Sequence, residues 1–167
     1  QRPLSKSFSQ EVHMRIEQKL AGMGLELAAP TAPIANFVPT VRTGNLLFVS
    51  GHISRLPDGS VLHPGKVGRE VSLAQGYEAA KLAMVNCLAS IKAALGDLDK
   101  VQRVVKLLVM VNASSEFDRQ FIVGNGASDL LVELYGEQGR HARSAVGMGS
   151  LPRGACVEIE MIVEVVD

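Results

Sequence analysis

The segment 157–165 constrains the fold most, because apolar side chains alternate strictly along it. Successive side chains of a β-strand point to opposite faces, so this pattern predicts a strand with one apolar face. The apolar face carries Val157, Ile159, Met161, Val163 and Val165, and the other face carries Cys156, Glu158, Glu160, Ile162 and Glu164. We therefore expect a sheet whose two faces differ in polarity.

Residues 73–95 predict a long helix. Ser72 is a candidate N-cap, and Gly96 is a candidate C-terminal stop. Apolar residues recur at steps of three or four, as on the core-facing stripe of a helix: Leu73, Tyr77, Ala80, Met84, Cys87, Ile91 and Leu95. A second helix is expected over about 116–135, with strain or a kink because Gly124 and Gly126 together cost it about 2 kcal/mol relative to alanine.

Four further strands are expected. Val41 and residues 46–50 predict a hairpin, because Gly44 and Asn45 tolerate the positive φ of a tight turn. Residues 101–112 alternate, but their second face is apolar too, through Val104, Leu108 and Met110, with Lys106 among them. A strand-like run of small residues surrounds Arg143. Since one helical layer covers only one face of such a sheet, we expect self-association over the other face.

The elements follow the order hairpin, helix, strand, helix, strand, strand, which predicts an α/β (α+β) fold with a mixed sheet covered on one face by two helices. We expect a single domain over residues 31–167. We expect residues 1–30 to form an N-terminal extension with a short helix that begins near Ser9 and ends near Gly22 or Gly24.

The composition argues against some classes of protein. Seventeen basic and 17 acidic residues cancel, and five Phe, two Tyr and no Trp provide few stacking platforms, so nucleic acid is not an expected partner. Cys87 and Cys156 form no CxxC pair, so we expect buried thiols and no zinc site. No apolar run reaches the roughly 20 residues of a membrane span. We expect a cytoplasmic protein with no membrane partner.

Three segments carry a resemblance to a known family: Gly-Asn-Leu-Leu-Phe-Val-Ser-Gly at 44–51, Ala-Arg-Ser-Ala-Val at 142–146, and Leu-Pro at 151–152 followed by Val-Glu-Ile-Glu at 157–160. In this order and spacing they resemble the Rid family, also called the YjgF/YER057c/UK114 or L-PSP endoribonuclease family. The resemblance runs from about Ile34 to Val165.

This resemblance implies a chorismate-mutase-like fold that assembles as a homotrimer, with sheets packed inward and ligand sites in clefts between subunits. It implies hydrolysis of reactive enamine and imine acids, such as 2-aminoacrylate, to 2-oxo acids and ammonia. No cofactor is implied. Ribonuclease activity and inhibition of translation are also attributed to some members of the family.

The resemblance also implies roles for individual residues. Arg143 matches the arginine that binds the substrate carboxylate, and its small neighbours leave the guanidinium free to make two parallel hydrogen bonds. Glu158 matches the acidic residue near the attacking water. Ser50 and Gly51 match the pair that opens the cleft.

Three positions depart from the pattern of the deaminase branch. Phe37 replaces a usual tyrosine, His52 a common glutamine and Ala145 a frequent cysteine. His52 could carry a proton to the leaving nitrogen, because an unperturbed histidine titrates near physiological pH. A small carboxylate ligand, such as a 2-imino or 2-oxo acid, is still expected.

Structural alternatives stay open for each of these residues. Arg143 could form an interface ion pair with Glu158 or Glu160, Glu158 could belong to a solvated acidic face, and His52 could be a packed side chain. His141 has the character of an ordinary loop residue. Three functions therefore compete: an enamine/imine deaminase, a non-catalytic binder of small 2-oxo acids, and an endoribonuclease or translation inhibitor.

Overall fold

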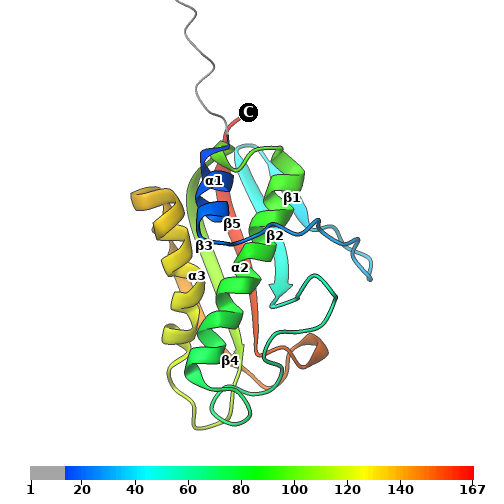
Figure 1. Cartoon of the computed structure of the whole chain (residues 1–167), viewed down its shortest axis with the longest axis vertical. Coiled ribbons are helices and arrows are strands. Elements are labelled where there is room, and N and C mark those ends of the chain that lie inside the picture. Colours follow the sequence, from blue (N-terminus) through cyan, green and yellow to red (C-terminus); the bar gives the residue numbers. More distant parts are fainter. Residues whose placement is uncertain (1–13) are drawn as a thin grey trace, which may run out of the picture.

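The computed structural model describes residues 14–167, which form a five-stranded sheet with helices (Figure 1). In chain order the elements are α1 Arg15–Gly22, β1 Thr40–Thr43, β2 Leu46–Ile53, α2 Leu73–Leu95, the 3₁₀ turn η1 Leu98–Lys100, β3 Val101–Asn112, α3 Gln120–Tyr135, the 3₁₀ turn η2 Gly136–Gly139, β4 Ala142–Met148, the 3₁₀ turn η3 Pro152–Gly154, and β5 Val157–Val165.

The strands lie in the order β1-β2-β5-β3-β4. β5 is antiparallel to both of its neighbours, whereas β3 and β4 are parallel. The long helices α2 and α3 run side by side across one face of the sheet (Figure 1). The predicted mixed sheet with two helices on one face is therefore confirmed.

β5 is the central strand of this sheet, and its side chains alternate between the core side of the sheet and the opposite side. Its five apolar side chains at odd positions are at most 2% exposed and join the core beneath α2 and α3. Glu158, Ile162 and Glu164 are only partly buried, and Glu160 is exposed. We call the side of the sheet away from the helices the open face. It carries these side chains together with Phe48, Leu108, Met110 and Val146, which lie opposite them in register.

Val104 does not belong to the open face, and that part of the prediction is wrong. The pairing of β3 with β5 shifts register on both sides of Val104, between Val101 and Arg103 and between Val104 and Lys106. These irregularities turn Val104 toward the helices, where it is 1% exposed. Strict alternation does not survive a bulge, and the sequence carries no clear sign of one at this position.

α2 begins and ends where the pattern predicts. The Ser72 hydroxyl accepts a hydrogen bond from Gln75 N, and the Gln75 side chain accepts one from Ser72 N, which completes a capping box. Gly96 follows the helix with φ 83°, a conformation that suits glycine.

α3 begins at Gln120, four residues later than predicted, and runs unbroken through both of its glycines. A Cβ on Gly126 would overlap the Tyr77 carbonyl of α2, and a Cβ on Gly124 would lie 3.1 Å from Arg143 Nη1. The two glycines therefore allow close packing against α2 and Arg143, and they do not interrupt the helix at the position where the sequence predicts strain or a kink.

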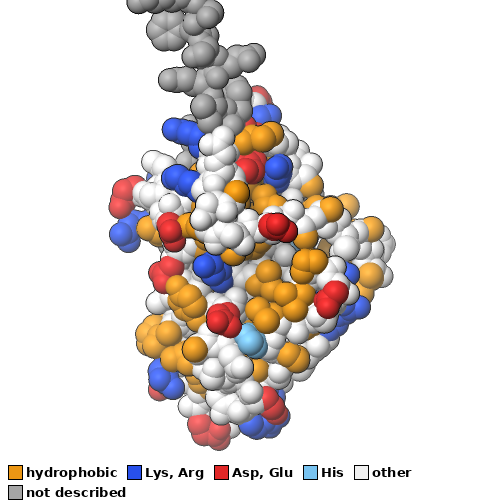
Figure 2. All heavy atoms as spheres, in the orientation of Figure 1, with side chains coloured by type: hydrophobic (Ala, Val, Ile, Leu, Met, Phe, Trp, Pro, Cys, Tyr) orange, Lys and Arg blue, Asp and Glu red, His pale blue; other side chains and the backbone are white. Residues whose placement is uncertain are grey.

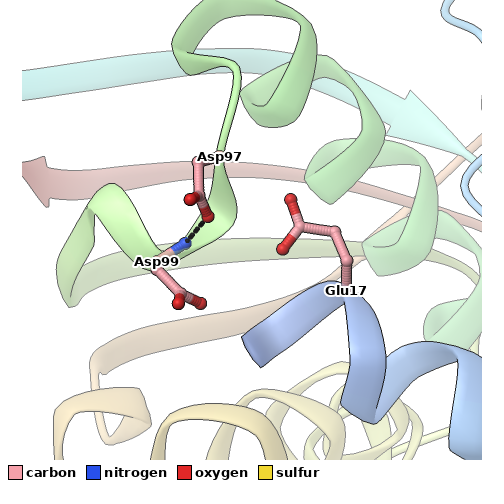
Figure 3. A group of neighbouring side chains, drawn as sticks. All are labelled: Glu17, Asp97 and Asp99. Carbon is pink, nitrogen blue, oxygen red and sulfur yellow. Dashed lines mark hydrogen bonds between the residues drawn. The ribbon is translucent and has the colours of Figure 1, made fainter. Parts of the chain in front are cut away.

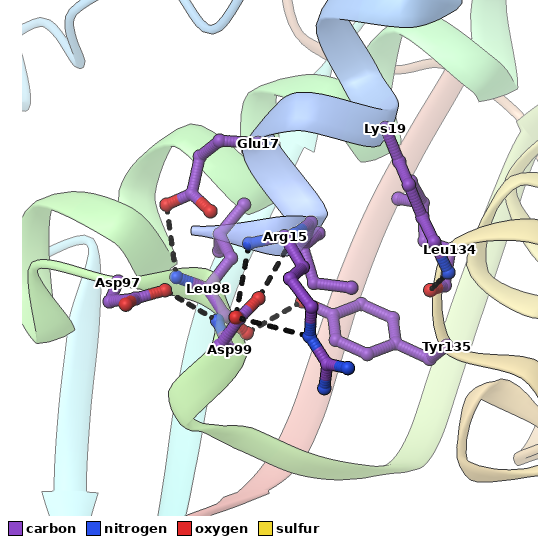
Figure 4. Close-up of polar contacts among 9 residues, drawn as sticks. Arg15, Glu17, Lys19, Asp97, Leu98, Asp99, Leu134 and Tyr135 are labelled. Atoms are coloured by element: carbon purple, nitrogen blue, oxygen red, sulfur yellow. Dashed lines mark hydrogen bonds and ion pairs between the residues drawn. The ribbon is translucent and has the colours of Figure 1, made fainter. Parts of the chain in front are cut away.

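α1 is held against the core. Ile16 and Leu20 are buried, and the Asp99 carboxylate accepts hydrogen bonds from Arg15 N and Ile16 N at 3.0 Å each, so it caps the helix from a distant part of the chain (Figure 4). The predicted end near Gly22 or Gly24 is confirmed at Gly22. The predicted start near Ser9 is wrong, because Met14 has a left-handed backbone conformation (φ 72°) and the helix begins at Arg15. The domain boundary at residue 30 stays a prediction. Within residues 14–167, no helix combines the length and apolar character that a membrane crossing requires.

Gly126→Ala tests the close contact between α2 and α3. We expect it to lower the free energy of unfolding by about 1–3 kcal/mol, because the added methyl group must push the two helices apart. Gly22→Ala in α1 is the control, since its Cβ would meet no atom within 4 Å. Urea unfolding followed by circular dichroism measures both variants, and equal stabilities would contradict this explanation of the glycine.

Candidate functional site

Arg143 lies on the edge strand β4 with its side chain against α3. Its Nη1 donates hydrogen bonds to Asn125 Oδ1 at 3.0 Å and to Ser128 Oγ at 2.9 Å, and its Nη2 donates one to the Phe121 carbonyl at 3.0 Å. These three acceptors come from successive turns of one helix. The guanidinium is thus held in one orientation by neutral groups alone.

The charge of Arg143 has no carboxylate partner within residues 14–167. Partial burial lowers the pKa of its guanidinium, and Asp129 opposes this effect from a distance. Of its five N–H donors, Nε–H and one Nη2–H make no hydrogen bond to the described residues. Nε and Nη2 are neighbours on the guanidinium, so these two donors remain available to a carboxylate ligand.

Ser50, Gly51 and Glu158 come together on the open face. A Cβ on Gly51 would overlap the Glu158 carboxylate, so glycine is required for this approach of β2 to the side chain. The contact lies at an irregularity of β2 between Val49 and His52. The Ser50 hydroxyl donates to the Val38 carbonyl at 2.7 Å and thereby holds the segment before β1 beside this group.

Burial raises the pKa of the Glu158 carboxyl, and the neighbouring charge of Glu160 raises it further. A carboxylate with a raised pKa is a better proton acceptor than an ordinary glutamate. Glu158 is therefore suited to remove a proton from water.

His52 lies on the other side of the sheet, toward α2. Its Nδ1 is 2.6 Å from the Ser50 carbonyl, and its Nε2 is 2.7 Å from Ser90 Oγ. Nδ1 must carry the proton to face a carbonyl, so Nε2 accepts from the Ser90 hydroxyl. Burial lowers the pKa of His52 and favours this neutral ring. The structure does not bring His52 to Glu158, and its role as a proton carrier stays a prediction.

Phe37 and Ala145 border the two groups. Phe37 precedes β1, near the segment that Ser50 holds, and is 52% exposed. Ala145 is two residues beyond Arg143 on the same face of β4 and packs against the core. Ala145 has no polar side-chain atom, so it can contribute shape but no proton chemistry.

Arg143 and Glu158 point to opposite sides of the sheet. Arg143 pairs with Leu107, which is buried beneath the helices, whereas Glu158 pairs with Met110 on the open face. β3 lies between their two strands. A ligand of a few heavy atoms therefore cannot touch both side chains of one chain.

The sequence reasoning missed Asn125, Ser128 and His141. His141 is more than a loop residue, since its Nε2 lies 2.9 Å from Ser128 Oγ. Ser128 is three residues from Asn125, and that spacing places both side chains on one side of α3. No separate signal marks these polar residues in a helix that is otherwise largely apolar.

A second cluster of acidic residues lies at the other end of the fold and consists of Glu17, Asp97 and Asp99 (Figure 3). Asp99 caps α1, Asp97 accepts a hydrogen bond from Asp99 N, and Glu17 accepts one from Leu98 N (Figure 4). These carboxylates therefore stabilise the junction between α1 and η1. Their bonds to backbone N–H groups explain most of the cluster, while Glu17 Oε2 is buried without a hydrogen-bond partner among the described residues.

The face of the molecule that carries the helices mixes charges of both signs. Lys and Arg side chains are interspersed with Asp and Glu side chains and with apolar patches (Figure 2). A nucleic-acid surface needs basic groups gathered on one face. This face offers no such stripe.

A family model described as "YjgF/chorismate mutase-like, putative endoribonuclease" matches residues 17–165. The chain belongs to this family. The match includes all five strands and most of α1. The resemblance found in the sequence and the predicted chorismate-mutase-like fold are thereby confirmed.

Individual relatives show how far the similarity extends. Protein TCP17 of Trypanosoma cruzi is 43% identical over 151 residues, covering 90% of this chain and 94% of that protein. The crystal structure of Atu1372 from Agrobacterium tumefaciens, a protein of unknown function, is 49% identical with a TM-score of 0.83, covering 90% of this chain and 94% of that one. RidA from the Antarctic bacterium Psychrobacter sp. PAMC 21119 is 28% identical with a TM-score of 0.58, covering 84% and 96%. This chain is therefore closer in backbone to Atu1372 than to that RidA.

The raised pKa of Glu158 is directly testable. We expect its carboxyl group to titrate above 4.5, the ordinary glutamate value, and Glu160→Gln to lower that midpoint because it removes a neighbouring negative charge. Carbon-13 NMR of labelled glutamate side chains, recorded against pH, measures the midpoint. Glu164→Gln, on the same face of β5, is the control and should move it less. A wild-type midpoint at or below 4.5 would contradict this description of the site.

Proposed function

We propose that this protein hydrolyses reactive enamine and imine acids of the 2-aminoacrylate type to 2-oxo acids and ammonia. The observation that carries the proposal is the state of Arg143: a partly buried cation, fixed by three neutral acceptors, whose Nε–H and one Nη2–H are unused. Such a group is suited to a planar carboxylate. Family membership and the similarity to a RidA support the same class of ligand.

The proposal includes assembly of two or more chains around each site. Because Arg143 and Glu158 point to opposite sides of one sheet, a shared ligand needs Arg143 of one chain and Glu158 of another. The open face supplies a surface for this contact, since Phe48 and Val146 are 42% and 40% exposed there. Burying a few hundred Å² of apolar surface at about 25 cal/mol per Å² contributes several kcal/mol before the cost of association. A homotrimer, with sheets inward, is the assembly we propose.

In the proposed mechanism, the two unused donors of Arg143 bind the carboxylate of the 2-imino tautomer and thereby fix its C=N carbon. A water molecule held about 3 Å from this carbon adds to it, and holding the two reactants in place supplies much of the rate gain. Glu158 accepts a proton from the water. Glu158 returns this proton to the nitrogen, which completes the carbinolamine. Transfer of the carbinolamine hydroxyl proton to the amine, again through Glu158, then expels ammonia and leaves the 2-oxo acid. No side-chain nucleophile is needed, so Ala145 is compatible with the reaction.

The main alternative is a non-catalytic binder of small 2-oxo acids, and it is favoured by a specific observation. Both ring nitrogens of His52 make hydrogen bonds within the fold, and Ala145 has no proton to give. Apart from Arg143, Glu158 is therefore the sole titratable group among the proposed site residues that can exchange a proton with a ligand. A binder would use Arg143 in the same way and release its ligand unchanged. A cytoplasmic location fits both functions and is part of the proposal.

An endoribonuclease is a third candidate, because the family description carries that name. A net charge of zero and the mixed charges in Figure 2 do not favour it. Incubation with messenger RNA, with Arg143→Ala as the control for contaminating nucleases, tests this candidate.

Turnover distinguishes the deaminase from the binder. A serine dehydratase generates 2-aminoacrylate in the assay, and pyruvate release is followed with lactate dehydrogenase. We expect the wild-type protein to accelerate the release above the buffer rate, and Glu158→Gln to abolish the acceleration while pyruvate still binds. Binding of pyruvate by the wild type without any acceleration would establish the binder instead.

Arg143→Ala tests the carboxylate site itself. We expect pyruvate binding, measured by calorimetry, to weaken by about 2–5 kcal/mol, because the ligand loses two charge-assisted hydrogen bonds. Arg140→Ala, which removes an exposed arginine paired with Glu137 next to the same strand, is the matched control and should bind as the wild type does. Light scattering should show the same trimer for all three proteins. Unchanged affinity in Arg143→Ala would exclude this carboxylate site.

A further inference from the structure

His141 belongs to the network that holds Arg143. It precedes β4 by one residue and lies two residues before Arg143, so both side chains extend from the same face of that segment toward α3. The His141 Nε2 lies 2.9 Å from Ser128 Oγ, and the same oxygen lies 2.9 Å from Arg143 Nη1. Ser128 therefore stands between the histidine and the arginine.

The hydrogen positions in this network follow from its partners. His141 Nδ1 is 2.7 Å from the Gly139 carbonyl, which can only accept, so Nδ1 carries the proton. Nε2 must then accept the single hydrogen of the Ser128 hydroxyl. As a result, a lone pair of Ser128 Oγ is available to accept from Arg143 Nη1. Each of these three hydrogen bonds then joins one donor to one acceptor.

Burial favours the neutral form of His141 that this arrangement needs. Burial lowers the pKa of the ring, the nearby charge of Arg143 lowers it further, and the bond to Gly139 opposes both effects. At neutral pH the ring can therefore accept from Ser128.

We propose that His141 is a positioning residue for Arg143: through the Ser128 hydroxyl it fixes the guanidinium so that the unused donors on Nε and Nη2 stay available to a carboxylate. This inference rests on the proposed function, in which Arg143 binds that carboxylate. Without an acceptor at Nε2, the hydroxyl of a serine within a helix turns to the carbonyl of the preceding turn or to water. The lone pairs of Ser128 Oγ are then no longer held toward Nη1, so the guanidinium is less firmly fixed.

A purely structural role for His141 makes a different prediction. Gly139 belongs to η2 and is buried, and a Cβ there would overlap the Leu131 carbonyl of α3. The bond from His141 Nδ1 could serve only to hold this turn against the helix. In that case the donor at Nδ1 would matter and the acceptor at Nε2 would not.

Two substitutions separate these roles. His141→Gln places an amide oxygen near the position of Nε2 and keeps an acceptor for Ser128, but it loses the donor to Gly139. His141→Asn places an amide nitrogen near Nδ1 and keeps that donor, but it loses the acceptor. Ser128→Ala removes the link itself, and Glu137→Gln, a change in the same turn outside the network, is the control.

The experiment has two readouts on the full-length protein. Calorimetry gives the affinity for pyruvate, and nitrogen-15 NMR of labelled arginine gives the rotation of the Arg143 guanidinium about its Nε–Cζ bond without any ligand. We expect Ser128→Ala and His141→Asn to weaken pyruvate binding about tenfold, because each removes about one hydrogen bond to a charged group. We expect both variants to speed the rotation of the Arg143 guanidinium as well. His141→Gln and Glu137→Gln should stay near the wild type in both. Thermal unfolding confirms that each variant is folded.

A loss in His141→Gln with none in His141→Asn would overturn the inference in favour of the structural role, as would unchanged rotation in Ser128→Ala. If the wild type does not bind pyruvate, the proposed function fails for this ligand class, and the rotation of Arg143 still decides whether His141 and Ser128 position it. The two failures are therefore distinguishable.

Discussion

The alternation of side chains along β5 is the constraint on which the rest of this structure depends. Because successive residues point to opposite faces, the strand that sends five apolar side chains beneath α2 and α3 must send Glu158 and Glu160 the other way. The same rule, carried across β3 to β4, sends Arg143 to the helix side. The two charged groups that the family resemblance assigns to one ligand are thus separated by the sheet, and this separation leads to the proposal that each site is shared between chains.

The second determinant is the close approach of α3 to its neighbours. Gly126 lets α3 pack against the backbone of α2, and Gly124 leaves room for the guanidinium of Arg143. Asn125 and Ser128 then meet Nη1 from the same helix. All acceptors around the arginine are neutral, so its orientation is fixed without neutralising its charge. An internal carboxylate would have held Arg143 equally well and would have competed with a ligand.

Periodicity in the sequence was sufficient to predict most of the fold. The bounds of α2 and β3 agree to the residue, because capping residues and alternation act locally. The predictions fail where contacts between distant parts of the chain determine the structure. Val104 turns inward at irregularities in strand pairing, and the glycines of α3 allow contact with residues that are remote in the chain. Similarly, the motifs are sufficient to propose Arg143 and Glu158 as site residues, but Ser128 and His141 become recognisable as neighbours of Arg143 only when α3 lies against β4. The face of the sheet on which each charged residue lies also becomes clear only from the register of three strands.

The most direct test of the shared site is complementation between two inactive variants. Arg143→Ala and Glu158→Gln chains are co-expressed with different affinity tags, mixed assemblies are purified through both tags, and deamination of 2-aminoacrylate is measured. If each site takes Arg143 from one chain and Glu158 from its neighbour, every mixed trimer regains one intact site, about a third of the wild-type number, whereas each variant alone stays inactive. If mixed assemblies form and remain as inactive as the single variants, while the wild type turns over, both residues act within one chain and a site shared between chains is contradicted.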